Sequence, residues 1–166
     1  MSFVGFTGTR NGMTDAQRVR VRELVRNRAV SFAIHGGCRG ADYDFHQIVN
    51  NTPAITIWVH PTFRPMNWPY EIFGRHAYTD AEMRLFDIVG AWRARGATLV
   101  AAPDQDPLRR NLTMVRIIAA RHGWWIATPK LNVEELRSGT WHCIRRVRKA
   151  KIPLCIVWPN GEVDEQ

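Results

Sequence analysis

The sequence predicts a doubly wound α/β domain in three layers, with a mostly parallel sheet of about six strands covered by helices on both faces. Two observations predict this fold class. Short apolar segments rich in β-branched and aromatic residues alternate along the chain with amphipathic helical segments. The strand segments are apolar on both sides instead of alternating in polarity, which is typical of parallel strands buried between helices.

Six segments have the composition of buried strands, and glycines bound the first two. Gly8 ends the first segment, and the pair Gly36 and Gly37 ends the second. The six predicted strands are residues 3–7, 30–35, 55–59, 97–101, 124–127 and 154–158. Residues 60–70 are rich in proline, so we expect no regular structure there.

Helix-start signals precede the amphipathic segments. Thr14 and Gln17 have capping-box spacing, and Thr79 and Glu82 repeat it before a helix expected over 79–95. In the first helix Val21, Leu24 and Val25 share one face, and Arg18, Arg22 and Arg26 point to solvent. The remaining helices are expected from residue 41 onward, over 111–121 and over 140–150.

Length and composition limit the class of protein. The 166 residues, 45 % of them hydrophobic, predict one domain over 1–160 and a polar, frayed tail over 161–166. No run of eighteen apolar residues and no secretory signal is present, so we expect no membrane partner. The three cysteines form no CxxC pair, which favours a cytoplasmic location.

Glycine, hydroxyl and arginine side chains recur after the predicted strands. In a doubly wound sheet, ligands bind beyond the carboxyl ends of the strands, where the strand order reverses. Glycines allow backbone N–H groups to approach an anion, and arginines bind phosphate in a bidentate manner. Residues 8–12, 36–42, 103–111 and 137–140 follow the strands. We therefore expect a phosphate site, although the spacing fits neither a dinucleotide fingerprint nor a P-loop.

These loops resemble a known superfamily over about residues 3–160. The matching segments are 6–10, 35–42, 110–111 and 138–141, which read FTGTR, HGGCRGAD, RN and SGTW. They look like the SLOG superfamily, which includes DNA-processing protein A and the cytokinin-activating phosphoribohydrolases. The resemblance implies a Rossmann-like fold that binds a nucleotide or a nucleotide derivative at these loops.

The leading interpretation is a nucleotide-binding sensor, scavenger or regulatory module. Its partner would be a small molecule resembling NAD or ADP-ribose, or a nucleoside monophosphate, with no cofactor and no metal required. The histidines and cysteines lack metal-ligand spacing. The ligand-binding residues expected are Gly8, Thr9, Arg10, Gly36, Gly37, Arg39, Gly40, Asp42, Arg110, Asn111, Ser138, Gly139, Thr140 and Trp141.

An enzymatic alternative is a phosphoribohydrolase or nucleoside 5′-monophosphate N-glycosidase, a hydrolase. The resemblance places Arg110 where the enzymatic members carry their arginine, and Asp42 is the nearest substitute for a catalytic carboxylate. Those members have glutamates after the GT pair, whereas here Trp141, His142 and Cys143 follow Thr140. A carboxylate stabilises the oxocarbenium-like transition state of glycoside cleavage, so this departure favours binding over turnover.

A second alternative is a single-stranded DNA-binding protein. The net charge of +8 and the basic run 145–151 motivate it. Trp68 and Trp141 are the tryptophans best placed by sequence to stack on a base.

A homodimer is a further possible partner, since dimers are common among the proteins that the chain resembles. Cys38 is interpreted as a small residue tolerated in a turn and His35 as a strand-end residue.

Overall fold

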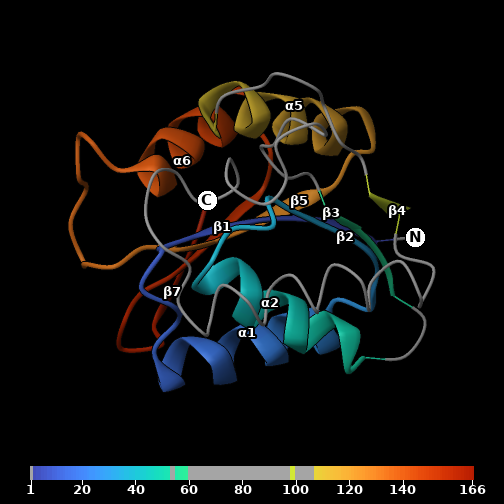
Figure 1. The fold of residues 1–166 in the computed structure, drawn as a ribbon, viewed down its shortest axis with the longest axis horizontal. Helices are drawn as coiled ribbons and strands as arrows, with labels where there is room; N and C mark the ends of the chain where they lie inside the picture. Colours follow the sequence, from blue (N-terminus) through green and yellow to red (C-terminus); the bar gives the residue numbers. More distant parts are fainter. Residues whose placement is uncertain (1, 53–54, 60–97, 100–106) are drawn as a thin grey trace, which may run out of the picture.

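The computed structural model describes residues 2–52, 55–59, 98–99 and 107–166. Over these residues the chain forms a seven-stranded sheet between two helical layers, with strand order β4-β3-β2-β1-β5-β6-β7. Figure 1 shows α1 and α2 on one face of the sheet and α5 and α6 on the other. The predicted fold class, a doubly wound α/β domain with a mostly parallel sheet, is confirmed.

The strands agree with the six predicted segments, and a seventh is added. They are Ser2–Gly8 (β1), Val30–His35 (β2), Thr56–Val59 (β3), Thr98–Leu99 (β4), Trp124–Thr128 (β5), Leu154–Val157 (β6) and Val163–Glu165 (β7). All neighbouring strands pair in parallel except β6 and β7, which pair antiparallel. The expectation of a frayed tail is therefore wrong: β7 lies within residues 161–166 and covers the edge of β6.

Local sequence fixes the starts of the helices. They are Asp15–Asn27 (α1), Ala41–Asn50 (α2), Pro107–Ala120 (α5) and Gly139–Lys149 (α6). The capping box of α1 is present, because Thr14 accepts from the Gln17 backbone and the Gln17 side chain accepts from the Thr14 N–H. The predictions for 60–70 and for the helix over 79–95, with its box at Thr79 and Glu82, lie outside the described residues.

Two hydrophobic clusters hold the layers together, one on each face of the sheet. Under α1 and α2, Phe6 of β1 stacks on Phe45 of α2 with ring centroids 4.2 Å apart. Under α5 and α6, Trp125 of β5 packs with Met114 of α5 and Ile144 of α6. Both clusters include side chains of β1 and β5, so the loops after these central strands begin at strands that are packed on both faces.

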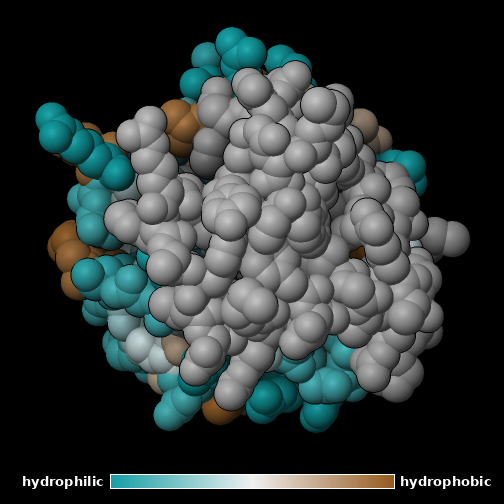
Figure 2. All heavy atoms as spheres, in the orientation of Figure 1, coloured by the Kyte–Doolittle hydropathy of each residue, from teal (hydrophilic) through white to brown (hydrophobic). Residues whose placement is uncertain are grey.

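The described surface is mostly polar. Figure 2 shows hydrophobic side chains as separate patches among hydrophilic ones on the face in view. Within the described ranges, the large apolar side chains that remain exposed are Val19, Leu108, Leu131, Val133 and Leu136. No described helix has the length and apolar character needed to cross a membrane.

Candidate functional site

The strand order creates a switch point between β1 and β5. After β1 the chain turns to α1 on one face, and after β5 it runs to α6 on the opposite face (Figure 1). Loops that diverge in this way leave a crevice at the carboxyl ends of the strands. The N–H of Thr9 donates to the carbonyl of Thr128 at 3.2 Å, so the loops after β1 and β5 begin side by side.

The loop after β1 also touches the loop after β2. The Ala41 N–H donates to the Thr9 carbonyl at 2.9 Å. Gly40 has φ +81°, and a Cβ there would collide with the Arg10 carbonyl. Only glycine combines this backbone conformation with so close an approach. The contact brings the backbones of Arg10 and Arg39, whose side chains are exposed, to one rim of the site.

Arg110 of α5 reaches under the loop after β2. Its Nη1 donates to the Gly36 carbonyl at 2.7 Å and lies 3.2 Å from Cys38 Sγ, and its Nε donates to Asn111 Oδ1 at 3.0 Å. The side chain is buried, and a Cβ on Gly36 would collide with its guanidinium. Among the described residues no carboxylate lies within ion-pair distance of Arg110. In the described part of the chain this buried guanidinium therefore has no ion-pair contact. Burial opposes its charge, but the nearby Cys38 and Asp42 stabilise that charge and the pKa of Arg110 is raised.

Asp42 supplies a buried carboxyl beside this arginine. One of its oxygens accepts from the Cys38 N–H at 3.1 Å. Burial raises the pKa of Asp42 from 3.8 to about 6, although the charge of Arg110 and hydrogen bonds from the loop oppose that rise. A carboxyl in this range changes protonation close to neutral pH, so it can act as an acid, a base or a hydrogen-bond acceptor.

Two histidines line the buried side of the same cluster. The Gly37 N–H donates to His35 Nδ1 at 3.1 Å, and His35 Nε2 lies 3.1 Å from His46 Nδ1. Burial, together with His46 and Arg110, holds the pKa of His35 well below its usual range. A neutral His35 that accepts at Nδ1 carries its proton on Nε2, and it therefore donates to His46. The predicted strand-end position of His35 is confirmed.

The start of α6 completes the edge of the sheet. Ser138 caps the helix by accepting from the Trp141 N–H at 3.4 Å, and nothing lies within 4 Å of a Cβ built on Gly139. One turn later, Cys143 is hydrogen-bonded to the Thr7 side chain and lies in the field of Arg110, and burial raises its pKa to about 12. These contacts tie α6 to β1 and α5.

The structure therefore joins some of the predicted site residues by direct contacts and leaves others without such a contact. Direct contacts join the loops after β1 and β2 to Arg110 and Asn111. Thr140 is buried in the first turn of α6, and none of the contacts described above joins Ser138, Gly139 or Thr140 to the other predicted residues. Their place at the edge follows from the topology, because α6 begins after β5.

The structure corrects the role expected of Trp141. This side chain is only 2 % exposed and packs in the cluster beneath α5 and α6. Arg148 lies over its ring, with Cζ 5.8 Å from the centroid. Trp141 is thus a core residue and is not available to stack on a base. Trp68, the other candidate, lies outside the described residues.

Sequence reasoning missed two members of the cluster, Cys38 and His46. Cys38 is not merely a tolerated small residue, since its Sγ lies against the Arg110 guanidinium. His46 could have been found from periodicity: Asp42, Phe45, His46 and Val49 share one face of α2, and all four are buried. Two polar residues on an apolar helical face indicate that the face covers a polar site.

The cluster gathers several kinds of charged and polar groups at one edge of the sheet. It combines three arginines, a carboxyl that titrates near pH 6, a neutral His35 beside His46, and glycine-rich backbone at the end of the central strand. No protein-family model, no curated protein and no solved structure matches this chain.

Proposed function

We propose that this chain binds a nucleotide or a nucleotide-derived small molecule at the carboxyl edge of its sheet, as a sensor, scavenger or regulatory module. The ligand would resemble NAD or ADP-ribose, or be a nucleoside monophosphate. The loop motifs support placing the chain among small SLOG-type proteins of the cytoplasm. In this proposal the rim arginines Arg10 and Arg39 bind the phosphate, and Asp42 accepts from a ribose hydroxyl.

The observation that carries the proposal is the buried charge of Arg110. Within the described residues the guanidinium is stabilised through space by Cys38 and Asp42 but makes no ion-pair contact, so an anionic ligand at the same edge would supply a direct one. In the described part of the site Arg10, Arg39 and Arg110 carry positive charge beside the carboxyl of Asp42, and His35 is neutral, which suits an anionic ligand. Backbone N–H groups in the loops after β1 and β2 can add hydrogen bonds to phosphate oxygens.

Calorimetry and thermal unfolding with AMP, dAMP, NAD and ADP-ribose test the proposal. A ligand at one hundred times its Kd raises the free energy of unfolding by about 2.7 kcal/mol. We expect this ligand-dependent shift in the wild type and its loss in Arg110→Gln. Arg116→Gln removes an exposed charge from the same helix and should keep the shift. A wild type that responds to none of these nucleotides contradicts the proposal.

The pKa of Asp42 favours one second candidate, N-glycosidic hydrolysis of a nucleoside monophosphate. In this reaction the bond between C1′ and the base breaks, water adds to C1′, and the base leaves with a proton. A carboxyl with a pKa of about 6 can hold that proton near neutral pH, and the adjacent arginine can bind the phosphate. Release of free base from a panel of nucleotides, abolished by Asp42→Asn and by Arg110→Ala, would support it. Binding without turnover would remove it.

A further inference from the structure

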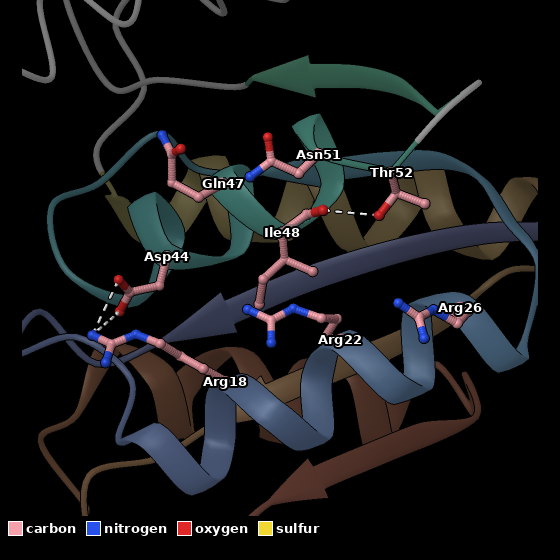
Figure 3. A pocket seen from close by; sticks show the side chains of 8 residues that line it. All are labelled: Arg18, Arg22, Arg26, Asp44, Gln47, Ile48, Asn51 and Thr52. Atoms are coloured by element: carbon pink, nitrogen blue, oxygen red, sulfur yellow. Dashed lines mark hydrogen bonds and ion pairs between the residues drawn. The ribbon is translucent and has the colours of Figure 1, made fainter.

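A concave feature lies between α1 and α2, and none of its lining residues belongs to the candidate nucleotide site. This groove has a volume of about 250 Å³, and its walls are Arg18, Arg22 and Arg26 of α1 and polar residues of α2 and its C-terminal turn. Figure 3 shows the three arginines in a row along α1, with Ile48 of α2 between the two helices. Four-residue spacing separates successive arginines by about 6 Å along the helix axis.

The arginines of α1 differ in whether the chain itself neutralises them. Outside the groove, Arg20 pairs with Glu23 at 2.8 Å and Arg28, the C-cap residue, with Glu165 at 2.6 Å. Within the groove, Arg18 pairs with Asp15 and Asp44. Arg22 and Arg26 are exposed, and neither forms an ion pair in the part of the chain that the structure describes. The groove thus carries two positive charges that the described residues leave uncompensated.

This arrangement is unfavourable for the helix alone. Like charges four residues apart repel each other by about 0.2–0.5 kcal/mol per pair, and Arg22 and Arg26 form one such pair. The other wall of the groove offers no carboxylate to Arg22 and Arg26, because it carries Gln47, Asn51 and Thr52 there. An external anion would supply the missing negative charge.

We infer that the α1–α2 groove binds the phosphodiester backbone of a single nucleic-acid strand. Arginine, glutamine, asparagine and threonine are the side chains that commonly contact phosphate and sugar. A row of arginines along the helix can meet successive phosphates, and the amides of Gln47 and Asn51 can donate from the opposite wall.

The shape of the groove favours a single strand over a duplex. A crevice of about 250 Å³ between two helices admits one flexible backbone, whereas a duplex is too wide to enter it. The lining contains no aromatic side chain on which a base could stack. The bases would therefore face outward, and binding would be independent of sequence and sensitive to salt.

Fluorescence anisotropy with a labelled oligothymidylate of about 16 nucleotides tests the inference. The double variant Arg22→Gln/Arg26→Gln removes the two unpaired charges of the groove. The double variant Arg146→Gln/Lys149→Gln removes two exposed charges from the basic end of α6, so the change in net charge is the same. We expect the groove variant to bind about tenfold more weakly and the α6 variant to stay within about twofold of the wild type.

Salt dependence and stability complete the test. The slope of log K against log salt should become less steep by about 1.4 in the groove variant, since each lost phosphate contact removes about 0.7. Its thermal unfolding should occur at or above the wild-type temperature, because like-charge repulsion is relieved. A wild type that does not bind at low salt, or an α6 variant that weakens binding as much as the groove variant, overturns the inference.

Competitors separate the alternative ligands. Unlabelled duplex or poly-glutamate of equal charge should displace the labelled strand poorly, and displacement as strong as that by unlabelled single strand overturns the inference. AMP and NAD should leave the bound strand in place, because the nucleotide site shares no residue with the groove. A failure of nucleotide binding in calorimetry would thus contradict the proposed function but not the inference about the groove. A failure of strand binding would contradict the inference about the groove but not the proposed function.

Discussion

At the scale of single residues, the cluster of Arg110, Asp42, Cys38, His35 and His46 determines the chemistry of the site. The sequence predicted Arg110 and Asp42 because they follow strands and match loop motifs. It did not predict that they are buried together, since the contacts of Arg110 with Gly36 and Cys38 span more than seventy residues of the chain. Tertiary contacts of this kind leave no local pattern, so only the structure shows them.

The raised pKa of Asp42 predicts a specific pH dependence of stability. Folding raises this pKa from 3.8 to about 6, so the folded state holds a proton that the unfolded chain has lost in that interval. This contribution to stability is fully present below pH 3.8 and is lost as the pH rises through about 6. Relative to Asp42→Asn, the wild type should gain about 2 kcal/mol between about pH 7 and pH 4.

Urea unfolding of both proteins at the two pH values measures this difference. The comparison with Asp42→Asn is needed because His35 acts in the opposite direction: its lowered pKa costs stability as the pH falls below about 6.5. His35 is present in both proteins, so its effect cancels in the difference. A difference that does not change with pH would mean that Asp42 keeps an ordinary pKa.

Gly36→Ala should displace the Arg110 guanidinium. The added Cβ would collide with the buried Arg110 side chain, and Arg110 cannot move into solvent without losing its hydrogen bonds. We expect a loss of about 1–3 kcal/mol in the free energy of unfolding and a loss of nucleotide binding. Gly139→Ala is the matched control, because nothing lies within 4 Å of its Cβ, and unfolding should change little. Equal behaviour of the two variants would contradict the close approach at Gly36.

At the scale of elements, the sequence predicts helices and strands correctly where the pattern involves residues that are close together in the chain. The capping box of α1, the start of α2 at Ala41 and the extent of α6 all depend on residues within one or two turns. β7 was missed because Val163–Glu165 is polar and short, and its pairing with β6 depends on the exposed edge of that strand. Trp141 was misplaced because the motif beside it resembles a ligand loop, whereas helical periodicity turns it toward the core.

Thr14 should stabilise α1 through its hydroxyl. Its Oγ1 accepts from the Gln17 N–H at 3.1 Å and donates to the Pro159 carbonyl at 2.8 Å, so it also connects α1 to the segment after β6. Thr14→Ala should lower the free energy of unfolding by about 1 kcal/mol in urea titrations. Thr14→Ser keeps the hydroxyl and should recover most of that loss, and a serine variant as unstable as the alanine variant would rule out the hydrogen bonds as the cause.

At the scale of the whole molecule, β7 replaces the buried apolar strand β6 as the edge of the sheet with a short strand that carries two acidic residues. Leu154 and Gln166 exchange both backbone hydrogen bonds, at 2.9 and 2.8 Å, and Arg28 pairs with Glu165. An uncovered strand edge is a template for pairing with another chain. β7 therefore contributes to solubility as well as to stability, even though its own residues are half-buried or exposed.

Removing the residues after Gly161 should expose the backbone of β6. We expect the shortened chain to unfold at lower urea concentration and to self-associate as its concentration rises, measured by light scattering after size-exclusion chromatography. Glu165→Gln is the control, because it removes only the ion pair with Arg28, which is worth at most about 1 kcal/mol at an exposed position. That variant should remain in the same association state as the wild type. If it associates as strongly as the shortened chain, the charge of β7 and not its coverage of the β6 edge prevents association.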